Sequence, residues 1–225
     1  MALLLNIDTA TEIASISISE NKNVLAYLTN NDQKDHASFL QPAIKNLLHK
    51  SGLSINKLNA IAVTAGPGSY TGLRVGMASA KGLCYAMNLP LITISTLEAM
   101  ALSSIKQVHD PTALYCPMID ARRMEVFTAV YDQQLAEIIK PCSIILDEGS
   151  FKELLVKNKI YFSGSGAVKL SDILDNENVS FTSNKFTPES MAELSYENYK
   201  NKNFADIFYA SPVYLKEFFT PLPKA

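Results

Sequence analysis

The segment with the greatest chemical potential covers residues 65–77 and reads A-G-P-G-S-Y-T-G-L-R-V-G-M. Its glycines and hydroxyl side chains follow an apolar run and precede a helical one. A strand, a glycine-rich turn and a helix start together form an anion site, because unpaired amides and the positive end of the helix dipole converge there. The residues that would hold a phosphate are Gly66, Gly68, Ser69, Thr71 and Gly72.

The spacing of these glycines leaves a second interpretation open. No Gly-Lys-Ser/Thr closes the segment as in a Walker motif, and the glycines do not follow G-x-G-x-x-G. The alternative is a structural turn that launches and positions the next helix. That helix carries small residues four apart, Gly76 with Ala80 and Ala78 with Gly82. Such spacing lets another helix approach closely, either within the lobe or from another subunit.

An acidic turn near the start of the chain is a candidate nucleotide contact. Asp8, Thr9 and Thr11 could place a carboxylate and two hydroxyls near a nucleotide and its magnesium ion. However, this turn contains no glycine, so phosphates cannot approach its backbone freely, and Glu12 would repel them. We therefore expect weak ATP or ADP binding at most, and no required cofactor.

A second charged turn follows in the other half of the chain. Arg122 and Arg123 are adjacent and lie between Asp120 and Glu125. Adjacent arginines can bind phosphate or RNA through charge-assisted hydrogen bonds. They can equally form surface ion pairs, which stabilise a protein only weakly. We keep both interpretations.

Other catalytic chemistry finds little support. The histidines (His36, His49 and His109) lack metal-ligand spacing, and the cysteines (Cys84, Cys116 and Cys142) include no C-x-x-C pair. Cys142 would act as a nucleophile only with a histidine base nearby in space. Ser69 lies outside a G-x-S-x-G context. We expect no catalytic residue and no metal site.

Composition narrows the class of protein. With 225 residues, 48% of them hydrophobic, the chain can bury one large core or two smaller ones. A net charge of −2 argues against a broadly basic nucleic-acid surface, so any RNA contact needs a local patch or a partner. The apolar start has no basic region, no run of eighteen apolar residues occurs, and the apolar stretch 83–94 is broken by Asn88 and Pro90. We expect a cytoplasmic protein that does not enter a membrane.

Hydrophobic periodicity predicts alternating strands and helices. In the first half we expect strands at 3–8, 13–19, 60–64 and 91–94, and helices at 35–50, 73–87 and from a Ser95 cap to 105. The strand at 13–19 alternates, which is typical of half-burial. In the second half we expect strands at 113–120, 124–131 and 160–163, and helices at 147–156 and 187–199.

An internal repeat organises these elements. I-D-T-A-T-E-I-A-S-I-S-I is similar to I-D-A-R-R-M-E-V-F-T-A-V, with one extra residue in the second turn. The repeat predicts two α/β lobes with mixed sheets and a cleft between the Asp8 and Asp120 turns. We place the first lobe at 1–106, with the helix 187–200 packing back on it. The second lobe is 107–186, and a tail at 201–225 packs on the body.

The glycine segment, combined with I-D-T-A-T-E and I-D-A-R-R-M-E-V-F, closely resembles the bacterial TsaB (YeaZ) family over nearly the whole chain. D-H-A, G-S-G at Gly164 and P-V-Y-L-K at Pro212 support it. Tyr70 stands where the family usually has Phe, and Lys216 where Arg is common. The resemblance implies an actin/Hsp70/sugar-kinase-like (ASKHA) fold. It also implies a non-catalytic scaffold in the complex that adds threonylcarbamoyl to the adenosine beside the anticodon of tRNAs.

In that family the partners are a TsaD-like catalytic subunit and a TsaE-like ATPase, and tRNA is reached through the complex. The resemblance maps the partner surface to helices at about 36–49 and 71–87. The interface residues it implies are His36, Leu40, Arg74, Gly76, Met77, Ala80 and Lys81. Alone, the chain could form a homodimer. Two other functions stay open: a nucleotide-dependent phosphotransferase or ATPase of this fold, and a glycoprotease-type peptidase.

Overall fold

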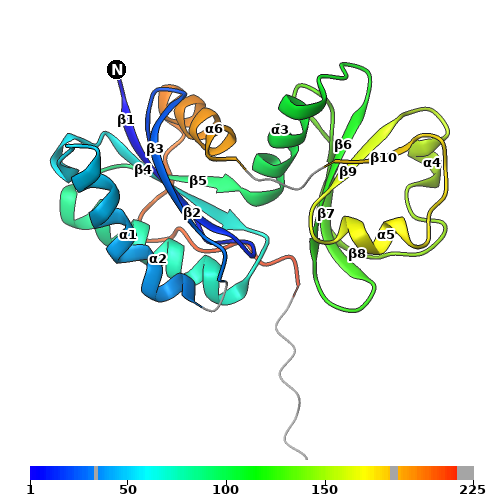
Figure 1. Ribbon diagram of the computed structural model, residues 1–225, viewed down its shortest axis with the longest axis horizontal. Coiled ribbons are helices and arrows are strands. Elements are labelled where there is room, and N and C mark those ends of the chain that lie inside the picture. The colour runs from blue at the N-terminus through cyan, green and yellow to red at the C-terminus, as the bar shows by residue number, and fades with distance from the viewer. Residues whose placement is uncertain (33–34, 183–186, 217–225) are drawn as a thin grey trace, which may run out of the picture.

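Two five-stranded mixed sheets, one in each lobe, form the frame of the protein (Figure 1). The computed structural model describes residues 1–32, 35–182 and 187–216. The strand order is β3-β2-β1-β4-β5 in the first sheet and β10-β9-β6-β7-β8 in the second. The strands are β1 (Leu3–Asp8), β2 (Ala14–Glu20), β3 (Asn23–Asn30), β4 (Ala60–Gly66) and β5 (Leu91–Ser95), then β6 (Leu114–Asp120), β7 (Glu125–Tyr131), β8 (Glu137–Ile145), β9 (Ile160–Ser163) and β10 (Val179–Phe181).

The two sheets share one topology. Each begins with three antiparallel strands, and its first strand then pairs in parallel with the fourth, which pairs in parallel with the fifth. The predicted duplicated, two-lobed α/β fold is confirmed. The prediction that the second turn contains one extra residue was wrong. The register pairs Asp8 with Ser15 and Asp120 with Val126, so the first turn (9–13) is longer than the second (121–124). Glu12 and Glu125 are therefore not equivalent.

Helices cover the sheets on both faces. α1 and α2 pack on one face of the first sheet and α6 on the other, while α3 lies between the two sheets (Figure 1). α4 and α5 pack on the second sheet opposite α3. The helices are α1 (His36–Lys50), α2 (Tyr70–Met87), α3 (Thr96–Val108), α4 (Lys152–Leu155), α5 (Ala167–Ser171) and α6 (Pro188–Lys200), with a 3₁₀ turn, η2 (Ile55–Lys57).

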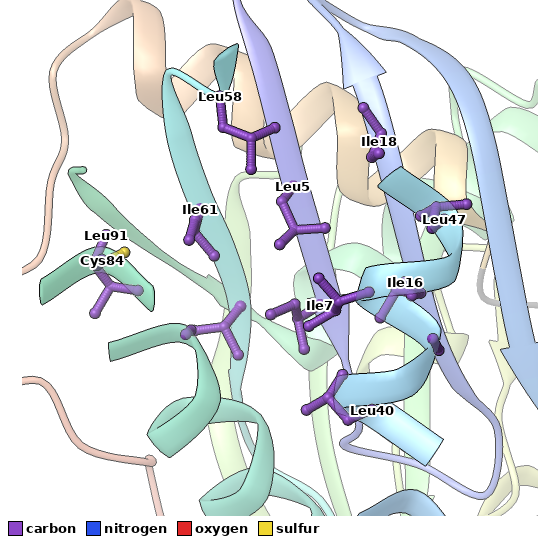
Figure 2. Packing of buried hydrophobic residues seen from close by; sticks show 14 of the residues in the cluster. Leu5, Ile7, Ile16, Ile18, Leu40, Leu47, Leu58, Ile61, Cys84 and Leu91 are labelled. Atoms are coloured by element: carbon purple, nitrogen blue, oxygen red, sulfur yellow. The ribbon is translucent and has the colours of Figure 1, made fainter. Parts of the chain in front are cut away.

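The core beneath α1 and α2 is shown in Figure 2. Ile7 and Ile16 from the sheet meet Leu40 and Leu47 from α1, and Met77 from α2 joins the same cluster. All five are almost fully buried. Burying each such side chain stabilises the fold by about 1.5–3 kcal/mol relative to exposure. This core holds both helices against one face of the sheet.

β2 is buried on both faces, not on one as its alternation predicted. Its isoleucines face α1 and α2, and its serines face the side covered by α6. Asn6 Nδ2 donates to Ser17 Oγ at 3.3 Å and to Ser19 Oγ at 3.1 Å, so these hydroxyls are bonded in the interior. The sequence pattern of β2 alone does not show that the serines are buried, because α6, which covers them, comes from a distant part of the chain.

Most other predicted elements are present within a few residues. Ser95 Oγ accepts from Glu98 N at 3.4 Å as the expected helix cap. The helix expected at 147–156 is reduced to α4, because Asp147 Oδ1 accepts from Gly149 N at 2.9 Å and turns the chain before it. The strands β3, β8 and β10 and the short helix α5 were missed. β3 has apolar residues on both of its faces, and Pro141 interrupts β8.

The last described segment runs along the first lobe and ends at the second. Ala205 N donates to Leu91 O at 2.8 Å, which adds a bridge at the edge of the sheet. Further on, Lys216 forms an ion pair with Glu125 of β7. The remaining tail, 217–225, and residues 183–186 of the predicted second lobe lie outside the described residues. None of the helices formed by the described residues is long and apolar enough to cross a membrane.

The small residues of α2 fall on two opposite sides of the helix. Gly76 and Ala80 are buried against the sheet, and a Cβ at Gly76 would collide with Thr9 Oγ1. Ala78 and Gly82 are exposed, and a Cβ at Gly82 would meet nothing within 4 Å. Gly76 and Ala80 therefore serve packing within the lobe.

This difference predicts opposite effects for two alanine substitutions in one helix. Gly82→Ala should raise the free energy of unfolding by about 0.5–1 kcal/mol, because alanine is the better helix former. Gly76→Ala should lower it by about 1–3 kcal/mol, because the added methyl overpacks the contact with Thr9. Urea unfolding of both variants measures this, and a gain in both would contradict the packing role of Gly76.

Candidate functional site

The glycine segment and the first turn lie against each other. Ser69 N donates to Ala10 O at 2.7 Å, and Thr9 Oγ1 donates to Gly72 O at 2.7 Å. A Cβ at Gly68 would collide with the Ala10 carbonyl oxygen, and one at Gly72 with the Thr9 carbonyl oxygen. The glycines therefore make room for protein backbone. Carbonyl oxygens, which repel phosphate, occupy the space beside the start of α2.

Gly66 accommodates the tail in the same way. Val213 N donates to Ala65 O at 2.7 Å, and a Cβ at Gly66 would lie 2.5 Å from Val213 O. The φ of Gly66 is +120°, a conformation that disfavours any side chain. The end of β4 is thus covered by a segment almost 150 residues further along. No local signal in the sequence points to this contact.

Side chains of neighbouring residues and of the tail cap and cover the start of α2. Ser69 Oγ accepts from Gly72 N at 3.3 Å and caps the helix. The ring of Tyr70 packs against that of Tyr214 of the tail, tilted by 35° with centroids 5.1 Å apart, and the Tyr70 hydroxyl accepts from Arg74 Nη1 at 2.6 Å. The tyrosine at position 70 thus adds a hydrogen bond that Phe could not make. Thr71 is exposed on the first turn of the helix.

Asp8 is sealed beneath this contact, with 1% of its surface exposed. Its Oδ1 accepts from Thr64 Oγ1 at 2.7 Å and from Ala10 N at 3.0 Å, while Oδ2 has no hydrogen-bond partner among the described residues. Burial raises the pKa of Asp8 to about 6, against the opposing effect of these hydrogen bonds and of His36. A carboxylate enclosed in this way offers little to a solvated magnesium ion.

His36, the first residue of α1, is buried as well. Its Nε2 lies 3.0 Å from the Thr11 carbonyl oxygen, so Nε2 carries the proton and donates. The first residue of α1 is therefore fastened to the turn that follows Asp8. Thr11 itself is half-buried, and its hydroxyl points toward the Ile13 carbonyl at 3.4 Å.

The interface residues predicted from the resemblance mostly face inward. Five of the seven are buried within the first lobe: His36, Leu40, Gly76, Met77 and Ala80. Only Arg74 and Lys81 reach the surface, and Lys81 Nζ donates to the carbonyls of Phe208 at 3.3 Å and Ala210 at 2.9 Å. Of the seven predicted residues, only these two have side chains at the surface of the lobe, and both belong to α2.

A hollow of about 300 Å³ lies between the outward face of α2 and the tail. Arg74, Ala78 and Lys81 line it on the side of α2, and Ala210 to Pro212 line the other side. The tail residues could not be found from the sequence, because their position depends on the contact at Gly66.

The second-lobe turn is built differently. Asp120 Oδ1 accepts from Lys169 Nζ at 2.6 Å and from Arg122 N at 2.5 Å. Partial burial opposes ionisation of Asp120, but Lys169 and Arg122 outweigh it and lower the pKa of the carboxyl. Arg122 and Arg123 are exposed at the tip of the turn. The structure thus brings the first-lobe site residues together and leaves the arginines on the other lobe.

The thiols are poorly suited to nucleophilic attack. Burial raises the pKa of both Cys84 and Cys116 to about 12, and burial also raises the pKa of Cys142. An activated cysteine needs the opposite shift. Within the described part of the chain, no three His, Cys, Asp or Glu side chains are placed to hold a metal ion.

Comparison with known proteins identifies a family model and relatives whose names agree with one another. Residues 23–216 match the family model described as tRNA N6-adenosine threonylcarbamoyltransferase (TsaD). The tRNA threonylcarbamoyladenosine biosynthesis protein TsaB of Bacillus subtilis (strain 168) is 28% identical over 220 residues, which cover 95% of this chain and 93% of that protein. TsaB of Escherichia coli (strain K12) is 36% identical over 130 residues, or 58% of this chain and 55% of that protein.

A solved structure supports the fold. A Pseudomonas aeruginosa protein with similarity to the peptidase YeaZ superposes with a TM-score of 0.81 at 22% identity, covering 96% of this chain and all of that one. At this identity the likeness bears on the fold alone, and it agrees with the two-lobed arrangement described above.

The enclosure of Asp8 predicts a pH-dependent stability. Because folding raises the pKa from 3.8 to about 6, the contribution of Asp8 is fully present below pH 4 and is lost as the pH rises through 6. Asp8→Asn cannot ionise. Its free energy of unfolding relative to the parent should therefore increase by about 2–3 kcal/mol between pH 4 and pH 8.

Urea unfolding across this pH range measures the effect, with Asp175→Asn, an exposed carboxylate of the second lobe, as the matched control. A difference between Asp8→Asn and the parent that stays constant with pH would show that Asp8 is not held in a desolvated site.

Proposed function

The chain belongs to the TsaB (YeaZ) proteins of the tRNA N6-adenosine threonylcarbamoyltransferase (TsaD) family, and we propose that it serves tRNA threonylcarbamoyladenosine biosynthesis as a non-catalytic subunit. In this proposal a TsaD-type protein is the catalytic partner and a TsaE-type ATPase acts with them. Transfer RNA is reached through the complex, and the chain works in the cytoplasm. The relatives named for this pathway support the assignment.

The closed site in the first lobe is the main observation that supports a non-catalytic role. The backbone of Thr9 and Ala10 fills the space that a phosphate would occupy beside Gly68 and Gly72. Asp8, which directly precedes this turn, is shielded from solvent. A substrate phosphate at this place would have to displace both the turn and the hydrogen bonds that hold it. We therefore infer that the chain needs no cofactor and binds ATP or ADP weakly at most.

The outward face of α2 is the proposed contact for the TsaD-type partner. Ala78 and Gly82 are small and exposed, so a partner helix could approach α2 closely. Tyr85, 73% exposed, lies on the next turn and offers a large apolar surface. Arg74 and Lys81 border the hollow beside the tail and supply charge at its rim. A homodimer of the isolated chain would use the same face.

The alternative, a nucleotide-dependent phosphotransferase or ATPase, predicts tight ATP binding with turnover by the chain alone. A peptidase predicts cleavage that Ser69→Ala abolishes. The proposed function predicts neither. Its test is to isolate the chain with its partners from the source cell and supply tRNA and the threonylcarbamoyl adenylate. The assembled complex should modify tRNA, and the purified chain alone should not. Modification by the chain alone would overturn the non-catalytic role.

A bulky residue on the outward face of α2 should block assembly. Ala78→Trp should reduce binding to the TsaD-type partner by about 100-fold, because the indole prevents close helix approach. The free energy of unfolding should stay within about 0.5 kcal/mol of the parent, since Ala78 faces solvent.

Ala136→Trp, at an exposed position in the second lobe, is the matched control and should bind normally. Affinity is measured by titration calorimetry and stability by urea unfolding. Unchanged affinity in Ala78→Trp would move the partner surface away from α2.

A further inference from the structure

The turn between β6 and β7 holds two arginines in an unfavourable backbone conformation. Arg122 has φ = 71° and Arg123 has φ = 51°, both in the left-handed region that favours Gly or Asn. Both residues are exposed, as is Met124 beside them at 38%. Strained residues of this kind persist where surrounding structure enforces them, and they cluster at functional sites.

Hydrogen bonds enforce this conformation. Arg122 N donates to Asp120 Oδ1 at 2.5 Å, and Ala121 N donates to Glu125 O at 3.1 Å. Glu125 N in turn donates to Arg122 O at 3.1 Å. The turn is therefore closed on itself, and it presents the two guanidinium groups from a fixed backbone. A pre-formed presentation reduces the entropy lost when a ligand binds.

The carboxylates around the turn already have other partners. Asp120 bonds to Lys169, and Glu125 bonds to Ser143 Oγ at 2.6 Å and to Lys216. Asp147, in the loop that follows β8, accepts from Gly149 N and Ser150 Oγ. Among the described residues, neither arginine forms an ion pair with any of these groups. The turn and its ion pairs thus keep an excess of positive charge at the tip.

We propose that Arg122 and Arg123 bind the phosphodiester backbone of tRNA; this rests on the proposed function and names the contact through which the chain meets its RNA. A guanidinium matches the geometry of two phosphate oxygens. Met124 adds an apolar contact for a ribose or base.

A nucleotide held between the lobes is the less suitable ligand. It would need donors from the first-lobe turn as well, and there the carbonyls of Thr9 and Ala10 face the glycine segment. The arginine turn is open to the outside and can receive a phosphate chain without the first lobe. The overall charge of −2 also favours contact through one local patch.

The test compares the parent with Arg122→Asn/Arg123→Asn in the complex with the TsaD-type partner. Asn adopts the left-handed conformation readily, so the turn keeps its shape while both charges are removed. Affinity for tRNA is measured from about 50 to about 300 mM salt. The variant should bind about tenfold more weakly at about 100 mM salt, and its log–log salt dependence should be shallower by about 1.5.

Lys140→Asn/Lys157→Asn removes two exposed cations from the same lobe and should match the parent. Arg122→Lys/Arg123→Lys should retain most of the salt dependence, because it keeps both charges. The proposal is overturned if the Asn variant keeps the affinity and salt slope of the parent, or if it weakens only ATP or ADP binding.

Failure of the proposed function is distinguishable from failure of this proposal. If the parent chain does not bind a TsaD-type partner, the proposed function fails. The same tRNA titration on the full chain alone then tests the role of the arginines. A loss of tRNA affinity in the Asn variant as large as that expected in the complex supports phosphate binding by the arginines, and an unchanged affinity overturns it.

Discussion

The close approach of the glycine segment to the first turn determines the arrangement of the first lobe. Without side chains at Gly68 and Gly72, the carbonyls of Ala10 and Thr9 can lie directly against the start of α2. Gly76, one turn further along the helix, lets the same side of α2 rest on Thr9. The backbone of the first turn, which is uncharged and already hydrogen-bonded, thus occupies the space beside the start of α2. In proteins that bind phosphate at a helix N-terminus, the phosphate lies in this space.

This contact also explains why two ionisable side chains are buried. Asp8 directly precedes the turn and His36 contacts it at Thr11, and each of the two side chains is nearly inaccessible. His36 donates to the Thr11 carbonyl, and Asp8 accepts from Ala10 N, so both side chains hold the turn in the shape that the glycines require. Desolvating a carboxylate costs free energy. The result is a first lobe whose central turn is fixed and covered, next to a second lobe whose equivalent turn is exposed to solvent.

The sequence predicted those parts of the fold that depend on local signals. The apolar strands, the cap at Ser95 and the repeated Ile-Asp turn are each encoded within a few residues, and the structure contains them. Long-range contacts were not predictable in this way. The serine face of β2 is buried because α6 covers it, and the end of β4 is covered by Val213. The inward orientation of Gly76 depended likewise on Thr9, which lies elsewhere in the chain.

The two pairs of small residues in α2 illustrate this limit and its consequence for function. Residues two apart in a helix point about 200° away from each other, so Gly76 and Ala78 necessarily occupy opposite sides. Both pairs have the same spacing, and only the tertiary structure tells which one faces the core. α2 is one continuous helix. The close contact between Gly76 and Thr9 therefore also sets how far Ala78 and Gly82 lie from the sheet. Gly76 therefore contributes to the proposed partner surface without being part of it.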